Sequence, residues 1–195
     1  MNLIVLSHMY PAQGNIYAGA FVVKQLTALT KIIEGEAFVV APIPWAPSVL
    51  YFRDKWRNYA ATKKYSLKNN IKIYRARYFR TPSRYYNFIE PFAMYISART
   101  VIKHILSVYG NNFILHAHAI LPDGLTAVFL KKEFNLPVVC TAHGSDTYDY
   151  PFRSKLLYHQ AKTVLTNLDA IVPVSSKLKD IIYELSSRRH GVYVV

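Results

Sequence analysis

The chain has 195 residues, a length that suits one large domain. Apolar residues make up 52% and charged residues 18% of the total, which excludes a disordered chain and leaves enough apolar surface for a sizeable core. The formal net charge is +13, and the stretch from Arg53 to Arg84 alone holds 11 basic residues against one acidic residue, Asp54. A basic surplus confined to one stretch indicates a docking surface on an otherwise ordinary domain.

Cysteine content and hydropathy restrict the compartment and the kinds of site. The single cysteine, Cys140, excludes an internal disulfide and a cysteine-based zinc or iron–sulfur site, and its apolar neighbours predict a buried thiol. Residues 1–6 are apolar but lack the basic flank of a signal peptide, and no apolar run is long enough to cross a bilayer. We therefore expect a cytoplasmic protein, with peripheral attachment to the inner face of the cell membrane left open.

Short apolar runs alternate with segments of helical periodicity along most of the chain. Expected strands cover residues 2–6, 37–41, 71–76, 113–116, 137–141 and 170–174, and expected helices cover 17–33, 85–109, 124–134, 152–168 and 175–187. Several runs are apolar at consecutive positions, which is typical of strands covered on both faces in a parallel sheet. The alternation predicts one Rossmann-like, doubly wound α/β domain over residues 1–195. Residues 191–195 read as the start of a further strand.

One segment, residues 42–70, interrupts this alternation and is predicted to be a functional insertion. It contains three prolines, two tryptophans and part of the basic cluster, and it is longer than most loops of compact domains. Its interleaved aromatic and basic residues suit an anionic membrane surface or single-stranded nucleic acid; a solvated loop, or pairing with another domain, is the plain alternative. The membrane is favoured because the sequence contains no recognised nucleic-acid-binding module. The candidate membrane patch consists of Arg53, Lys55, Trp56, Arg57, Lys63 and Lys64.

The loop after the first expected strand carries two glycines, Gly14 and Gly19, just before a helix. Their spacing differs from the GxGxxG fingerprint of dinucleotide-binding folds, which disfavours a nicotinamide cofactor. Glycines at this place either allow the backbone to approach a phosphate or sugar, or provide a flexible loop ahead of the helix. The chain has neither the Gly-x-Ser-x-Gly elbow of a serine hydrolase nor a phosphate-binding P-loop.

Polar residues gather at the carboxyl ends of the fourth and fifth expected strands, where ligands collect in open parallel sheets. They are His116, His118 and Asp123 after the fourth strand, and His143, Gly144, Ser145 and Asp146 after the fifth. A metal site built from the three histidines and Asp146 matches no standard zinc spacing, whereas imidazoles at a cleft suit acid–base chemistry or hydrogen bonding to sugar hydroxyls. A buried structural role is favoured for His116, inside its strand. For residues 143–146 a functional role is favoured, because glycine permits close approach of a ligand.

These motifs occur together in an order that resembles the N-terminal half of a family 4 glycosyltransferase of GT-B architecture. The resemblance rests on His118 in a His-x-His, on His143-Gly-Ser-Asp146, and on Pro11, Gly14 and Gly19-Ala-Phe-Val22. It includes Ile171-Val-Pro-Val-Ser-Ser-Lys-Leu178 and extends over essentially all of the chain.

The resemblance implies two Rossmann-like domains that face each other across a cleft, transfer with retention of anomeric configuration, and no metal or other cofactor. It implies that His118 contacts the sugar at the reaction centre and that Gly14 and Gly19 lie near the donor diphosphate. The donor would be a nucleotide-sugar bound mainly by a C-terminal domain that falls beyond Val195. The acceptor would be a glycan or a lipid-linked envelope molecule. The implied acceptor side consists of Tyr10, His143, Gly144, Ser145 and Asp146.

Two functions of different classes follow from these features. The first is the acceptor-binding half of a retaining glycosyltransferase, expected to be inactive without its C-terminal partner, in cis or as a separate chain. The second is a non-catalytic basic α/β module that binds an anionic membrane or nucleic acid. The sequence leaves the donor sugar, the nucleotide, the acceptor and the oligomeric state open.

Overall fold

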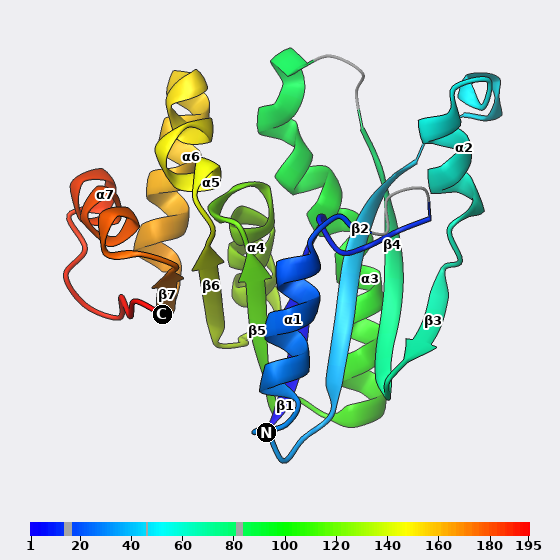
Figure 1. The fold of residues 1–195 in the computed structure, drawn as a ribbon, viewed down its shortest axis with the longest axis horizontal. Coiled ribbons are helices and arrows are strands. Elements are labelled where there is room, and N and C mark those ends of the chain that lie inside the picture. The colour runs from blue at the N-terminus through cyan, green and yellow to red at the C-terminus, as the bar shows by residue number, and fades with distance from the viewer. Residues whose placement is uncertain (14–16, 46, 81–83) are drawn as a thin grey trace. The chain divides into compact units, whose positions relative to one another are not determined.

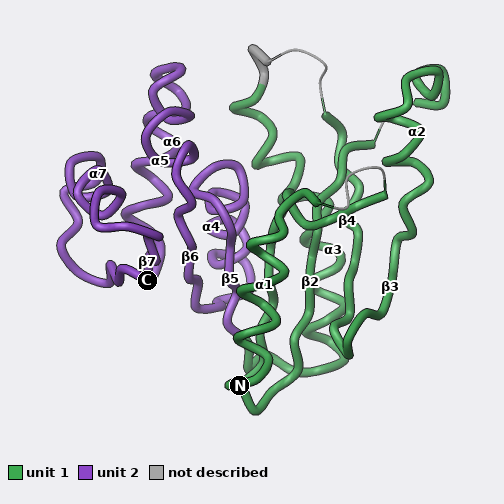
Figure 2. Tube along the Cα trace, viewed as in Figure 1, with its two compact units in different colours: residues 1–113 green, residues 114–195 purple. Residues whose placement is uncertain are grey.

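A computed structural model describes residues 1–13, 17–45, 47–80 and 84–195 of the chain (Figure 1). Its contacts divide the chain into two compact units, residues 1–113 and 114–195, and each is described by itself (Figure 2). In both units mostly parallel strands alternate with helices that pack on them, which confirms the predicted α/β class.

The strands of unit 1 follow the order β3-β4-β2-β1. They are β1 (Asn2–Leu6), β2 (Ala37–Trp45), β3 (Tyr65–Lys68) and β4 (Ile71–Phe79). β1 and β4 both run parallel to β2, and β3 pairs antiparallel with β4 at the edge. β1 and β2 are buried over nearly their whole length, as their continuous apolar runs predict.

The helices of unit 1 are α1 (Ala20–Leu29), α2 (Asp54–Ala61) and α3 (Glu90–Tyr109), with 3-10 turns at Ser48–Leu50 and Arg84–Ile89. α3 packs on β2 and β4. Its buried face consists of Glu90, Pro91, Met94, Ala98, Ile102, Ile105 and Leu106, largely at the three- and four-residue spacing of an amphipathic helix. None of the helices in the described ranges is long and apolar enough to cross a bilayer.

The segment predicted as an insertion, residues 42–70, contains regular structure. Residues 42–45 complete β2, and α2 and β3 follow; Ala46 lies outside the described residues. β1 pairs with β2 only as far as Val40, whose backbone faces β1. In a strand, the N–H groups of every second residue point to the same side, so residues 42 and 44 face the same side as Val40. β1 no longer pairs with β2 at these positions, so the missing N–H groups of Pro42 and Pro44 cost no hydrogen bond to β1. The prolines are therefore compatible with a strand, and the strand expected at residues 37–41 continues to Trp45.

Unit 2 contains three parallel strands in the order β5-β6-β7. They are β5 (Phe113–His118), whose first residue closes unit 1, β6 (Val138–Ala142) and β7 (Ala170–Pro173). Cys140 is fully buried in β6, as its apolar neighbours predict, and burial raises the pKa of its thiol. The expected strand at residues 191–195 runs beside β7, with one parallel bridge between Val192 and Ile171. The Gly191 carbonyl accepts from the Ile171 N–H, and the N–H groups of Tyr193 and Val195 donate to β7 carbonyls.

The helices of unit 2 are α4 (Leu125–Phe134), α5 (Ser145–Tyr148), α6 (Lys155–Asn167) and α7 (Ser176–Ser186). α4 packs on β6, α7 packs on β7, and α6 packs against both α4 and α7. Two serines cap helices: the Ser154 hydroxyl accepts from the Leu157 N–H of α6, and the Ser175 hydroxyl accepts from the Leu178 N–H of α7. The cap at Ser175 places the start of α7 directly after the carboxyl end of β7.

Candidate functional site

Three histidines from the carboxyl ends of β5 and β6 form a contiguous cluster in unit 2. His116 Nε2 lies 2.7 Å from the Thr141 hydroxyl, and the rings of His116 and His118 are 4.4 Å apart. His118 Nδ1 lies 3.1 Å from His143 Nε2, and these two rings are nearly parallel, with 12° between their planes. The structure thus brings together the three imidazoles that the sequence singled out.

Burial keeps this cluster uncharged. It lowers the pKa of His116 to about 4 and that of His118 to about 2, with the neighbouring histidines adding to the effect. Burial also lowers the pKa of His143, although the nearby Asp146 carboxylate opposes the change. All three rings are therefore neutral at pH 7 and act through hydrogen bonds. Within the described ranges, no three His, Cys, Asp or Glu side chains are grouped to hold a metal ion.

One nitrogen of the cluster, His118 Nε2, is buried and has no hydrogen-bond partner among the described residues. The His118 side chain is 0% exposed. Leaving a buried polar atom unpaired costs about 1–3 kcal/mol, so such atoms are uncommon in folded proteins and often belong to functional sites. His118 therefore carries one buried, directional hydrogen-bonding atom that no described residue pairs with.

The Asp146 carboxylate organises the two loops around the histidines. Its Oδ1 accepts hydrogen bonds from the N–H groups of His143 (3.0 Å) and Gly144 (2.7 Å), and its Oδ2 accepts one from Ile120 (2.8 Å). Asp146 is only 7% exposed, so its oxygens are committed to backbone and not to solvent. Gly144 has φ of 143°, a conformation that favours glycine, which explains why this residue stands at the turn. Asp123, the other acidic candidate, is fully buried in the turn at Ile120–Gly124.

Backbone strain accompanies the cluster. Ala119, directly after His118, has φ of 97°, which side-chain-bearing residues rarely adopt. It is held there because its N–H donates to the Thr141 carbonyl (3.0 Å) and its carbonyl accepts from the Gly124 N–H (3.0 Å). The turn after β5 is thus fixed on both sides of Ala119.

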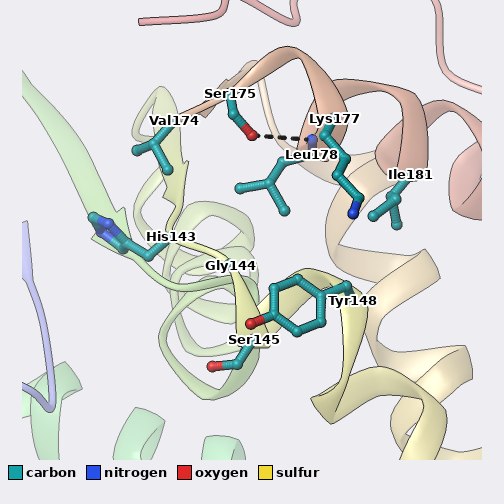
Figure 3. A pocket seen from close by; sticks show the side chains of 9 residues that line it. All are labelled: His143, Gly144, Ser145, Tyr148, Val174, Ser175, Lys177, Leu178 and Ile181. Atoms are coloured by element: carbon teal, nitrogen blue, oxygen red, sulfur yellow. Dashed lines mark hydrogen bonds between the residues drawn. The ribbon is translucent and has the colours of Figure 1, made fainter.

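A pocket of about 600 Å³ opens beside the cluster, within unit 2 (Figure 3). Its lining residues are His143, Gly144, Ser145, Tyr148, Val174, Ser175, Lys177, Leu178 and Ile181. His143, Gly144 and Ser145 were predicted as acceptor-side residues, whereas Tyr148 and the lining residues between 174 and 181 were not. The available signal was the Ser175 cap, since a helix that begins at the carboxyl end of a parallel strand borders the usual ligand-binding edge.

The predicted site residues of unit 1 lie in the segment between β1 and α1. Tyr10 is 6% exposed, and burial raises the pKa of its hydroxyl. The Arg75 guanidinium lies 5.2 Å from the Tyr10 ring and donates to the Pro11 carbonyl at 2.6 Å. Gly19 caps α1 with φ of 57°, and a Cβ there would lie 2.2 Å from the Met9 carbonyl oxygen, so only glycine fits. Gly14 lies outside the described residues.

The basic stretch from Arg53 to Arg84 divides into internal and exposed cations. Several are used inside unit 1: Lys72 bonds to Glu36 and Tyr109, Arg75 to Pro11, Arg77 to the carbonyls of Ala60 and Thr62, and Arg80 pairs with Glu90. In the candidate membrane patch, Arg57 pairs with Asp54, and Trp56 is half-buried against Tyr59. Besides Arg57, the exposed cations among the described residues of this stretch are Arg53, Lys55, Lys63, Lys64 and Lys68.

Comparison with known proteins gives one curated relative along nearly the whole chain. TuaC of Bacillus subtilis (strain 168), named as a teichuronic acid biosynthesis glycosyltransferase, is 25% identical over 187 residues. The match covers 95% of this chain and 47% of TuaC, so the chain spans about half the length of that relative.

Solved structures with the same fold include an N-terminal domain and two proteins crystallised with UDP. The trehalose-6-phosphate phosphatase N-terminal domain of Candida albicans matches all of this chain and 48% of its own, with TM-score 0.58 and 16% identity. UGT89C1 of Arabidopsis thaliana, complexed with UDP, matches 100% of this chain and 52% of its own, with TM-score 0.58 and 10% identity. A UGT transferase of Siraitia grosvenorii, also with UDP, has TM-score 0.55 and 11% identity, with 100% and 51% covered.

Identities this low establish the fold alone, but the family follows from the sequence itself. The model of glycosyltransferase family 4 matches residues 45–195, which include β3 through β7, the histidine cluster and the pocket. The chain belongs to glycosyltransferase family 4.

Proposed function

We propose that the chain is the acceptor-binding half of a retaining glycosyltransferase that moves a sugar from a nucleotide-sugar to a glycan or lipid-linked envelope acceptor. Membership of family 4 supports sugar transfer. The UDP bound in two proteins of the same fold supports a nucleotide-sugar donor. The teichuronic acid in the name of TuaC supports an envelope polymer as the acceptor.

The observation that carries this proposal is the buried, unpartnered Nε2 of His118. A sugar hydroxyl both donates and accepts hydrogen bonds, so it pairs with this nitrogen whichever tautomer the ring adopts. His118 Nδ1 is already engaged with His143 Nε2, which holds the ring in place. The ring therefore acts as a fixed hydrogen-bonding group that orients the transferred sugar.

The neutrality of the cluster suits this chemistry. A sugar leaving a diphosphate develops positive charge at its anomeric carbon, in a transition state that resembles an oxocarbenium ion. An imidazolium close to that carbon would oppose the reaction, whereas the depressed pKa of His118 keeps its ring uncharged. In the proposed mechanism residues 143–145 contact the acceptor and Asp146 holds them in place, while the loop ahead of α1, with Gly19 at its end, receives the donor diphosphate.

The test is the His118→Ala variant of the whole protein, assayed for transfer from a panel of nucleotide-sugars. Loss of one preorganised hydrogen bond at the reacting sugar is expected to reduce turnover by about 100-fold or more, with an unchanged circular dichroism spectrum. His159→Ala is the matched control, because His159 is exposed on α6. Wild-type turnover in His118→Ala would remove His118 from the mechanism. A whole protein that transfers no sugar would favour the alternative, a non-catalytic basic binding module.

We also propose that the exposed cations around α2 attach the protein to anionic lipid. Arg53 and Lys55 lie at the start of α2, and Lys63 and Lys64 follow its end. Two large apolar side chains precede the helix and are unusually open to solvent, Val49 at 75% and Phe52 at 73% exposed. Cations together with exposed apolar groups favour the headgroup region of a membrane.

A further inference from the structure

The pocket in unit 2 has two chemically different walls. On one side are the His143 ring and the Ser145 hydroxyl; on the other are the aliphatic side chains of Val174, Leu178 and Ile181, together with Ser175 and Lys177 (Figure 3). Its volume of about 600 Å³ is in the range of cavities that hold small ligands, and its lining mixes polar and apolar groups. The pocket therefore suits a ring-shaped ligand with one polar and one apolar surface, such as a pyranose.

Tyr148 supplies an open aromatic surface at this pocket. Its side chain is 57% exposed although the residue belongs to α5, and the neighbouring Val174 is 43% exposed. An exposed aromatic ring is a common platform for an apolar ligand face, because it contributes a large contact area with few rotatable bonds. The C–H face of a sugar ring matches it.

The pocket also carries one cation, Lys177, in the first turn of α7 (Figure 3). Lys177 is exposed, and no ion pair or hydrogen bond of its side chain occurs in the described part of the chain. Of the acidic residues nearby, Asp146 accepts three backbone N–H groups and Asp149 pairs with Arg153. Asp180, one turn further along α7, is exposed but does not line the pocket. Since His143 is neutral at pH 7, Lys177 gives the pocket a positive potential.

We propose that this pocket binds an anionic sugar unit of the acceptor, one that carries a carboxylate or a phosphate. The sugar ring packs on Tyr148, its hydroxyls bond to His143 and Ser145, and its anionic group pairs with Lys177 Nζ. This inference rests on the proposed function, in which residues 143–146 face the acceptor, and it adds the chemical class of that acceptor. Lys177 and Tyr148 are then specificity-determining residues and not catalytic ones.

The experiment is a titration of the ¹⁵N-labelled 195-residue chain, followed by amide chemical shifts. Three probes are compared: methyl β-glucuronide, glucose 6-phosphate and the neutral methyl β-glucoside. We expect shifts in the amides of residues 143–148 and 174–178 with every probe, and tighter binding of at least one anionic probe, by about fivefold at low salt. The two anionic probes separate a carboxylate from a phosphate as the preferred group.

Variants assign the preference to its residue. Lys177→Met is expected to reduce binding of the anionic probe to the level of the glucoside, whereas Lys177→Arg retains the preference. Lys179→Met is the matched control, because Lys179 lies on the same helix but over the Tyr183 ring. Tyr148→Ala is expected to weaken all three probes. Raising the salt to 0.5 M is expected to remove most of the preference, since it screens an exposed pair.

The outcomes separate this inference from the function on which it rests. Equal binding of neutral and anionic probes, or an unchanged preference in Lys177→Met, overturns the anionic specificity and leaves the acceptor site in place. If no probe shifts the amides of residues 143–148, the acceptor role of this pocket fails together with the inference.

Discussion

Asp146 shows how one side chain determines the geometry around the histidines. Three N–H groups, from Ile120, His143 and Gly144, point at its two oxygens, and the residue is nearly excluded from solvent. Hydrogen bonds to a charged acceptor contribute more than neutral ones, and buried donors left without an acceptor are costly. Asp146 is therefore a positioning residue, which holds the segment after β6 against the turn after β5.

Substitution at Asp146 is predicted to destabilise the protein. Asp146→Ala leaves three N–H groups without their acceptor and is expected to lower the free energy of unfolding by about 3 kcal/mol, measured by urea denaturation. Asp146→Asn is expected to lose less, because its one amide oxygen still accepts the His143 and Gly144 N–H groups. Asp180→Ala, at an exposed position of α7, is the control. Stability of Asp146→Ala equal to that of the control would contradict the positioning role.

At the scale of elements, the basic stretch has two functions that the charge count does not separate. Arg75 and Arg77 are two positions apart on β4, so their side chains lie on the same face of the strand. Arg77 donates to the Ala60 and Thr62 carbonyls at 2.8 and 3.1 Å, which satisfies the carboxyl end of α2. These arginines build unit 1, and the cations left for an external partner are those around α2 and on β3.

The exposed cations around α2 are predicted to bind anionic lipid. Each lysine near a charged membrane contributes about 1 kcal/mol, so the double variant Lys63→Glu, Lys64→Glu should bind anionic vesicles at least about tenfold more weakly. Co-sedimentation with vesicles of phosphatidylcholine, with and without phosphatidylserine, measures this. Lys24→Glu, Lys31→Glu is the matched control, because both lysines are exposed in or just after α1 and the charge change is the same. Equal binding of wild type to both vesicle types would argue against electrostatic docking.

At the scale of the whole molecule, the neutral histidines predict acid-sensitive stability. Their folded pKa values lie below the usual 6.5, at about 4 for His116 and about 2 for His118, so the unfolded chain binds more protons between those values. Their contribution is complete above pH 6.5 and is lost as the pH falls toward the folded pKa values. In that window each such histidine lowers the free energy of unfolding by about 1.4 kcal/mol for each pH unit of acidification.

Urea denaturation between pH 7 and pH 4.5 measures this loss. His116→Gln is expected to reduce the slope of the free energy of unfolding against pH by the contribution of one proton. His159→Gln, at an exposed position of α6, is expected to leave that slope unchanged. A wild-type stability that does not change between pH 6.5 and 4.5 would show that the cluster is not buried in solution.

Much of the fold could be predicted because burial leaves a periodic record in the sequence. The expected strand at residues 2–6 coincides with β1, and the expected helices at 124–134 and 175–187 lie within one residue of α4 and α7. α2 and β3 were missed because both carry many charged and polar residues and therefore show little apolar periodicity. The expected strand at residues 37–41 stopped short of Trp45, because the missing partner that makes Pro42 and Pro44 compatible with β2 is a property of the sheet and not of the strand.

The site was only partly predictable for the same reason. The order of strands and helices placed His116, His118 and His143 at one edge of a parallel sheet, and the motifs were sufficient to suggest family 4. The motifs did not show that the Asp146 carboxylate accepts hydrogen bonds from backbone N–H groups, since those groups come from two separate loops. Lys177 and Tyr148 attracted no notice, because a lone lysine or tyrosine has no distinctive spacing.

By itself, the sequence determined the α/β class, the positions of most buried strands and the family, because these depend on local apolar patterns and on short motifs. The tertiary structure alone decided which of the clustered cations are internal and which histidine nitrogen is left unpaired. It also decided which residues share the pocket with His143. Those properties depend on partners that are distant along the chain, and pairing and desolvation are properties of such contacts rather than of any one residue.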